Sequence, residues 1–301
     1  LQDLSTVNID NGLQVLLPNV WIKALGDHAL IPYLEDIKIN QVTYKKSAEI
    51  MKENFLLNTA LSDFHEYPSF SNKNAALVAS GPSLNETVNW LKEVEDKIEI
   101  FVVGSALKVL LANNIQPSAV VIIDPKPNII NQLENIDYDG LLFYLSTANH
   151  QAILQHKGKR FILLQQGYEE AEKLARIKGL PLVETGGSVS TTTFSLLEIL
   201  NFKNIFLFGL DLGFKGEHTH ANLSTSGRKV QKEENLREVL SNSGDIIFTP
   251  SNLHTYLRWF NAKMERTILK VYNTSWNGAK INKVPYINKQ QLYQLLQLEN
   301  L

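Results

Sequence analysis

Short apolar runs alternate with polar, helix-like stretches through the middle of the chain, and most runs end at a small or polar residue. Near-continuous apolar strands alternating with helices are typical of a parallel sheet that is buried on both faces. The pattern predicts an α/β fold, a Rossmann-like, mostly parallel sheet with helices on both faces. The strands are expected at residues 75–79, 98–103, 119–123, 141–145, 161–164 and 205–208.

The chain before and after this alternation follows a different pattern. Helical spacing predicts a helix at residues 47–61, and residues 67–72 are typical of a connection, so we place a boundary near residue 70. Residues 213–250 are polar and contain Gly, which predicts a long functional loop. The expected organisation is a partly helical N-terminal segment at 1–70, a Rossmann-like domain at 71–285 that includes a helix at 254–272, and a C-terminal helix within 286–301.

Composition excludes several classes of protein. The 29 basic and 31 acidic residues nearly cancel, which argues against a nucleic-acid partner, because such proteins usually carry a basic excess. The absence of cysteine excludes disulfides, thiolate catalysis and cysteine-ligated zinc. No apolar run reaches the roughly 18 residues of a membrane span, and the first residues lack the pattern of a signal peptide. We therefore expect a soluble cytoplasmic enzyme or binding protein.

The residues at the predicted strand ends are small, hydroxylic or acidic. In a parallel α/β sheet, ligands bind outside the carboxyl ends of the strands. Small residues there let a ligand approach the backbone, and the helix N-termini that follow favour anions. The candidate nucleotide-binding and substrate-binding residues are Ser80, Gly81, Pro82, Ser83, Gly104, Ser105, Asp124, Thr185, Gly186, Gly187 and Ser188.

The first of these loops, residues 80–83, is neither of the two common phosphate-binding motifs. No Gly-Lys-Ser/Thr follows Gly81, so it is not a Walker loop, and it lacks the Gly-x-Gly-x-x-Gly spacing that nicotinamide cofactors require. Ser83 and Glu86 also match a capping box, Ser-x-x-Glu, so Ser83 has the alternative of only starting a helix. The Thr185 to Ser188 turn has a similar alternative, an N-cap, although two adjacent glycines point to a close approach of another group to the backbone.

Two acidic and two histidine residues are candidates for chemistry. Asp124 and Asp211 end predicted strands, where each could bind a sugar hydroxyl, hold a metal, act as a base or only stabilise a turn. His218 and His220 alternate in the long loop, so that in an extended segment both would face one side. A general base or phosphate contact is favoured for them over a metal site, and ordinary surface histidines are the alternative.

Several motifs together resemble the central domain of the motility accessory factor (Maf) family. They are Ala75-Ala76-Leu77-Val78-Ala79-Ser80-Gly81-Pro82-Ser83-Leu84, Ile122-Ile123-Asp124-Pro125-Lys126-Pro127, Phe208-Gly209-Leu210-Asp211-Leu212-Gly213-Phe214 followed by His218-Thr219-His220-Ala221, and Asn273-Thr274-Ser275-Trp276-Asn277-Gly278-Ala279-Lys280-Ile281. Trp276-Asn277 departs from the Glu-Gly that is usual at that point of the family. The central domain of the family is in turn similar to bacterial sialyltransferases.

The resemblance implies a bacterial glycosyltransferase, sialyltransferase-like, that moves a nonulosonic acid from a CMP-activated donor to a Ser/Thr hydroxyl of a protein acceptor such as flagellin. Residues 80–83, 104–105, 124 and 185–188 would then contact the donor, and Asp211 or His220, with His218 beside it, would take the acceptor proton. This reading implies no metal and no cofactor. A related branch with the same Gly-Pro-Ser signature implies an alternative, an MptE-like 6-hydroxymethylpterin diphosphokinase that uses ATP and Mg²⁺. A non-catalytic binding protein of the same fold is the third hypothesis.

Overall fold

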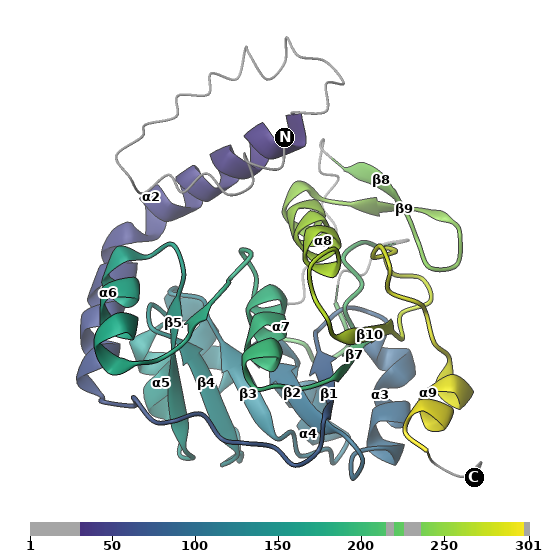
Figure 1. Ribbon diagram of the computed structural model, residues 1–301, viewed down its shortest axis with the longest axis horizontal. Coiled ribbons are helices and arrows are strands. Elements are labelled where there is room, and N and C mark those ends of the chain that lie inside the picture. The colour runs from purple at the N-terminus through teal and green to yellow at the C-terminus, as the bar shows by residue number, and fades with distance from the viewer. Residues whose placement is uncertain (1–30, 215–219, 226–235, 298–301) are drawn as a thin grey trace.

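The computed structural model describes residues 31–214, 220–225 and 236–297 (Figure 1). Its centre is an eight-stranded sheet in the order β10-β7-β1-β2-β3-β4-β5-β6, in which every pair of neighbours is parallel. This confirms the predicted α/β fold. The strands are β1 (Asn74–Val78), β2 (Glu99–Val103), β3 (Ala119–Ile122), β4 (Leu141–Leu145), β5 (Arg160–Gln165), β6 (Leu182–Val183), β7 (Asn204–Phe208) and β10 (Lys270–Asn273).

Helices cover both faces of the sheet. The strands advance in one direction from β1 to β6 and then return to β7 on the other side of β1, so right-handed connections place the return helix on the opposite face. The helices α7 and α8 lie on one face, and α3, α4 and α5 lie on the other (Figure 1). The helical elements are α2 (Ile31–Ala60), α3 (Leu84–Glu93), η2 (Gly104–Ala106), α4 (Leu107–Ala112), η3 (Pro127–Gln132), α5 (His150–Gln155), α6 (Glu169–Lys178), α7 (Val189–Ile199), α8 (Ser251–Met264) and α9 (Lys289–Leu295).

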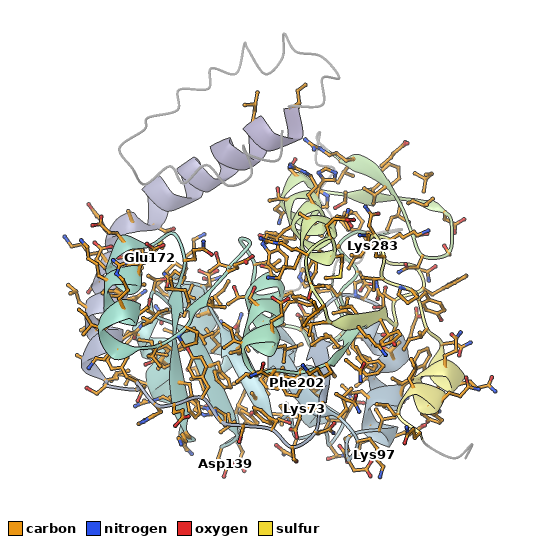
Figure 2. All side chains as sticks on the ribbon, viewed as in Figure 1. Lys73, Lys97, Asp139, Glu172, Phe202 and Lys283 are labelled. Carbon is orange, nitrogen blue, oxygen red and sulfur yellow. The ribbon has the colours of Figure 1, made fainter. Side chains whose placement is uncertain are left out.

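The core lies in the central strands and the aromatic side chains against them. Phe101, Phe143 and Phe161 occupy neighbouring strands, are almost completely buried, and form a row whose closest ring centroids are 5.0 Å apart. Burial of each such side chain contributes about 1.5–3 kcal/mol. Lys97 and Asp139, which precede β2 and β4, lie at the amino end of the sheet (Figure 2).

Four strands lie where the sequence pattern did not predict them. The helix expected at residues 254–272 ends at Met264, and residues 270–273 form β10, which pairs with β7. The expected loop at 213–250 contains an antiparallel hairpin of β8 (Arg237–Leu240) and β9 (Ile246–Thr249). The two-residue strand β6 was also missed. These strands are short and alternate in burial, so they lack the continuous apolar runs that identified the central strands.

The helix expected at residues 47–61 is the second half of the longer α2, which runs from Ile31 to Ala60. In Figure 1 this helix extends above the carboxyl ends of the strands, on the same side as α8 and the β8–β9 hairpin. The boundary near residue 70 stays a prediction. None of the helices in the described part of the chain combines the length and apolar character that crossing a bilayer requires.

Candidate functional site at the carboxyl end of the sheet

The strand order reverses direction between β1 and β7, and such a switch point is where ligands bind in open α/β sheets. The loops after these two strands touch directly. Gly81 N donates to Gly209 O at 2.8 Å, and a Cβ on Gly81 would overlap that carbonyl and the Asp211 carboxylate. Gly81 is therefore required for the close approach of the two loops, a reason that the sequence pattern suggested only in general terms.

Asp211 connects the two loops through its carboxylate. Ser83 N donates to Asp211 Oδ2 at 3.0 Å, and the Ser275 hydroxyl donates to Asp211 Oδ1. The side chain is almost completely buried, and this burial raises its pKa, while the hydrogen bonds from Ser275 and the Ser83 backbone act in the opposite direction. Both oxygens thus accept protein donors, an arrangement that favours positioning of residues 80–83 over proton transfer to a substrate.

Replacement of Asp211 separates these two roles. Asp211→Asn is expected to retain at least half of the wild-type activity, because an amide can accept from Ser83 N through Oδ1 and donate to the Ser275 hydroxyl. Asp211→Ala is expected to lower the free energy of unfolding by about 2–4 kcal/mol, because buried donors lose their acceptor. Urea denaturation measures the stability, and the initial rate of the catalysed reaction measures the activity. A folded Asp211→Asn protein with more than a 100-fold loss of rate would identify Asp211 as the base instead.

Ser83 does not form the predicted capping box. Its backbone is already helical, with φ −62° and ψ −16°, and its side chain makes no capping hydrogen bond. The hydroxyl is buried close to the Asp211 carboxylate but meets no acceptor with hydrogen-bond geometry. The capping interpretation of Ser83 is therefore wrong, because the backbone N–H at this position bonds to Asp211 instead.

The hydroxyls of Ser80 and Ser105 meet at the ends of β1 and β2. Ser105 Oγ donates to Ser80 Oγ at 2.9 Å, and both residues are buried. The described part of the long loop, residues 220–225, lies over them, since Ala221 N donates to Ser80 O at 2.8 Å and Thr225 N donates to Ser105 O at 3.2 Å.

The other predicted residues near these serines have different environments. Gly104 leaves room for the Gln132 side chain, which a Cβ would overlap. His220 is half-buried and begins the 220–225 segment, and the next residue, Ala221, donates its N–H to Ser80 O at the end of β1. His218 lies outside the described residues, so the expected alternation of the two histidines stays a prediction.

Asp124 stabilises the turn after β3 and also faces α8. Lys126 N donates to Asp124 Oδ1 at 2.9 Å, and Asn149 N donates to Asp124 O at 3.0 Å. Burial and the negative charge of Asp124 both raise the pKa of the Tyr256 hydroxyl on α8. The turn role that was one alternative for Asp124 is thus present, and its half-exposed carboxylate also lies near a phenol hydroxyl.

The turn at residues 185–188 starts α7. Ser188 Oγ accepts from Thr191 N, and the Thr191 hydroxyl accepts from Ser188 N, which completes a capping box. Gly186 and Gly187 have φ of +53° and +85°, and a Cβ on Gly186 would lie 2.8 Å from Trp259. The N-cap alternative is confirmed, and the two glycines allow a close approach of side chains from α8, with Tyr256 over Gly187.

A basic cluster on β8 and α8 was not predicted. Arg237 donates from a guanidinium N–H to His254 Nδ1 at 3.1 Å, so the ring is a neutral acceptor there. Burial and the positive charges of Arg237 and Arg258 lower the pKa of His254 to about 4. No sequence motif marks His254, since Arg237 lies in the predicted loop and Arg258 lies one turn along the same helix.

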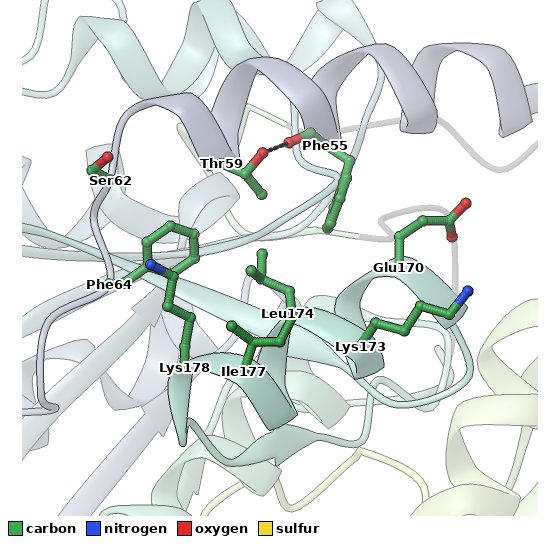
Figure 3. Close-up of a pocket in the computed structure, with 9 residues that line it drawn as sticks. All are labelled: Phe55, Thr59, Ser62, Phe64, Glu170, Lys173, Leu174, Ile177 and Lys178. Atoms are coloured by element: carbon green, nitrogen blue, oxygen red, sulfur yellow. Dashed lines mark hydrogen bonds between the residues drawn. The ribbon is translucent and has the colours of Figure 1, made fainter.

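Two further features of the described residues bear on where a ligand binds. No three His, Asp or Glu side chains in those ranges lie together as metal ligands would. A groove of about 490 Å³ lies between α2 and α6, with Phe55, Phe64, Leu174 and Ile177 among its lining residues (Figure 3). It contains none of the predicted site residues, and its lining combines these apolar side chains with Glu170, Lys173 and Lys178.

Comparisons with known proteins agree with the fold. The protein-family model described as 6-hydroxymethylpterin diphosphokinase MptE-like matches residues 45–217. The solved structure of the MAf glycosyltransferase from Magnetospirillum magneticum AMB-1 is similar with a TM-score of 0.63 and 16% sequence identity, over 86% of this chain and 42% of that chain. This chain therefore corresponds to less than half of that enzyme. No curated protein matches the chain.

Proposed function

The chain belongs to the 6-hydroxymethylpterin diphosphokinase MptE-like family, and within it we propose a glycosyltransferase that moves a nonulosonic acid from a CMP-activated donor to a Ser/Thr hydroxyl of a protein such as flagellin. The observation that carries this proposal is the extent of the structural likeness. The family model ends at residue 217, whereas the MAf glycosyltransferase fold covers 86% of the chain and so includes elements beyond it. The chain beyond residue 217 includes α8, which carries Tyr256 beside Gly187 and His254 beside Arg237.

The strand-end site has groups suited to a nucleoside monophosphate leaving group. CMP carries a single phosphate, which backbone N–H groups and hydroxyls at a helix start stabilise without a large positive charge. Ser80 and Ser105 supply hydroxyls at the ends of β1 and β2, and Gly81 keeps that loop close to β7. The guanidiniums of Arg237, which donates to His254, and of Arg258, one turn along α8 from His254, are suited to the carboxylate of the sugar.

The reaction needs one proton acceptor. In the proposed step the acceptor oxygen attacks the anomeric carbon, the bond from that carbon to the CMP phosphate oxygen breaks, and CMP leaves with the bonding electrons. His220 takes the hydroxyl proton, because an imidazole titrates near neutral pH and this one lies beside the Ser80–Ser105 pair. Asp211 holds residues 80–83 in place.

Family membership favours a second candidate, diphosphate transfer from ATP to a hydroxymethylpterin. That reaction requires Mg²⁺ and positive groups around three phosphates. Asp124, half-exposed at the end of β3, is the described carboxylate best placed to contact such an ion.

Ligand-dependent stabilisation distinguishes the two candidates. The melting temperature should rise with CMP and not with ATP–Mg²⁺, since a ligand at 100 times its Kd stabilises by about 2.7 kcal/mol. Stabilisation by ATP–Mg²⁺ alone would establish the kinase alternative. With a CMP-activated nonulosonate and a Ser/Thr peptide, His220→Ala should lower the rate at least 100-fold, whereas His65→Ala, at an exposed position after α2, should leave it unchanged.

A further inference from the structure

Trp276 is a large aromatic side chain that remains 47% exposed just after the carboxyl end of β10. Its ring lies beside that of Tyr286, with centroids 4.7 Å apart and planes inclined at 57°. The exposed ring of Trp276 is apolar surface, and a ligand that covers it gains free energy because that surface is removed from water. The two rings therefore form a partly exposed aromatic surface at the ligand-binding end of the sheet.

The backbone holds both rings in fixed positions. Asn273 N donates to Pro285 O and Ile287 N donates to Asn273 O, each at 2.9 Å, so the segment with Tyr286 pairs beside the end of β10. On the other side, Asn242 Nδ2 donates to Ser275 O at 2.8 Å, directly before Trp276. The aromatic surface is thus preorganised, which lowers the entropic cost of ligand binding.

A carboxylate lies close to the same surface. Glu86 is in the first turn of α3, three residues after Ser83, and it is exposed. Ser83 N and the Ser275 hydroxyl both donate to the Asp211 carboxylate, so the first turn of α3, with Glu86, lies beside the segment that carries Trp276. In agreement with this, burial and the negative charge of Glu86 raise the pKa of the Tyr286 hydroxyl. Asn85 is adjacent and accepts from Asn222 N at 3.0 Å.

We propose that Trp276, Tyr286 and Glu86 form a binding site for an uncharged pyranose ring, next to the strand-end site. One face of a pyranose presents C–H groups that cover an aromatic ring, while its hydroxyls need hydrogen-bond acceptors at the edge. An ionised carboxylate accepts from two neighbouring hydroxyls at once. The negative charge of Glu86 disfavours an acidic sugar, so the site selects a neutral hexose or N-acetylhexosamine. This inference does not rest on the proposed transfer reaction.

Saturation-transfer NMR on the whole chain tests the site. Methyl glucoside and N-acetylglucosamine should bind with a Kd on the order of 1 mM, and N-acetylneuraminic acid should bind at least 10-fold more weakly. Trp276→Ala should abolish saturation transfer to the neutral sugars, and Trp276→Phe, which keeps a ring, should retain part of it. Glu86→Gln should reduce the ratio between the Kd of the acidic sugar and the Kd of the neutral sugars, because the variant lacks the negative charge.

Controls keep the outcomes distinct. Ile268→Ala removes an apolar side chain that is 89% exposed elsewhere, and it should leave sugar binding unchanged. CMP-induced stabilisation should be the same in wild type and Trp276→Ala, so a failure of the transfer proposal would be recognised separately. Absence of neutral-sugar binding to the wild type, equal binding to Trp276→Ala, or tighter binding of the acidic sugar would each overturn the proposal.

Discussion

Gly209→Ala is expected to lower the free energy of unfolding by about 2–5 kcal/mol and to abolish ligand binding at the strand-end site. Gly209 has a φ of +64°, a left-handed conformation that costs a residue with a Cβ roughly 1–2 kcal/mol. The added methyl would also overlap the carbonyl of Ala79, and overpacking of this kind typically costs about 1–3 kcal/mol.

Gly209→Ala should affect ligand binding because the added methyl would overlap Ala79, next to the candidate ligand loop. Ala79 is the last residue before the loop at 80–83, and its N–H donates to Phe208 O at 2.8 Å. Movement of the Ala79 carbonyl away from residue 209 would separate β1 from β7 where their loops meet. The bonds from Gly81 N to Gly209 O and from Ser83 N to Asp211 both depend on that contact.

Gly179→Ala is the matched control for Gly209→Ala. Gly179 ends α6 with a φ of +65°, nearly the same as Gly209, and an added Cβ there would meet nothing within 4 Å. Its loss of stability should stay near the conformational cost alone, and its ligand binding should be unchanged. Urea midpoints measure both losses. Equal destabilisation of the two variants would show that the overlap with Ala79 contributes nothing.

The central sheet was predictable because its strands are buried on both faces. Strands such as residues 205–208 are continuous apolar runs, and burial on both sides requires that pattern. The edge strand at 270–273 alternates between more exposed and buried residues and follows α8 after a short connection. Its apolar residues therefore cannot be distinguished in the sequence from a continuation of the helix. Short edge strands depend on contacts with their neighbour, in this case β7, which lies far away in the sequence.

The sequence predicts which loops lie at the candidate site, but it does not predict which residues contact each other there. Strand-end positions identified Ser80, Ser105 and Asp211 because ligand loops follow parallel strands. The partners of these residues were not predictable, since Asp211 bonds to Ser83 across 128 positions and to Ser275 across 64 positions. The local Ser-x-x-Glu motif indicates a helix cap at Ser83. In the structure the Ser83 backbone N–H donates instead to the carboxylate of Asp211, which is distant in the sequence.

Helix α2 contributes to the site through two buried asparagines that sequence reasoning also missed. Asn58 Nδ2 donates to Ser146 O at 2.9 Å and to Ala148 O at 2.8 Å, and its Oδ1 lies 2.9 Å from His150 Nδ1. Asn54, one turn earlier, donates to Pro125 O at 3.0 Å. Both side chains thus attach α2 to the loops that follow β3 and β4.

Asn58→Leu is expected to lower the free energy of unfolding by about 2–5 kcal/mol. Leucine has a similar size, but it leaves two buried carbonyls without a donor, each at a cost of about 1–3 kcal/mol. Asn58→Asp keeps the size more closely and places a carboxylate against the same carbonyls, so it should destabilise at least as much. Urea denaturation measures both variants.

A control on the same helix separates the lost hydrogen bonds from a change in helix propensity. Lys52→Leu introduces leucine at an exposed position of α2 and should change stability by no more than about 0.5 kcal/mol. If Asn58→Leu were as mild as Lys52→Leu, the bonds from α2 to the β4 loop would carry no net stability. The expected difference also extends to function, because the Asp124–Pro125 turn is held by Asn54 on the same helix face. A loosened α2 should therefore weaken ligand binding in Asn58→Leu and leave it unchanged in Lys52→Leu.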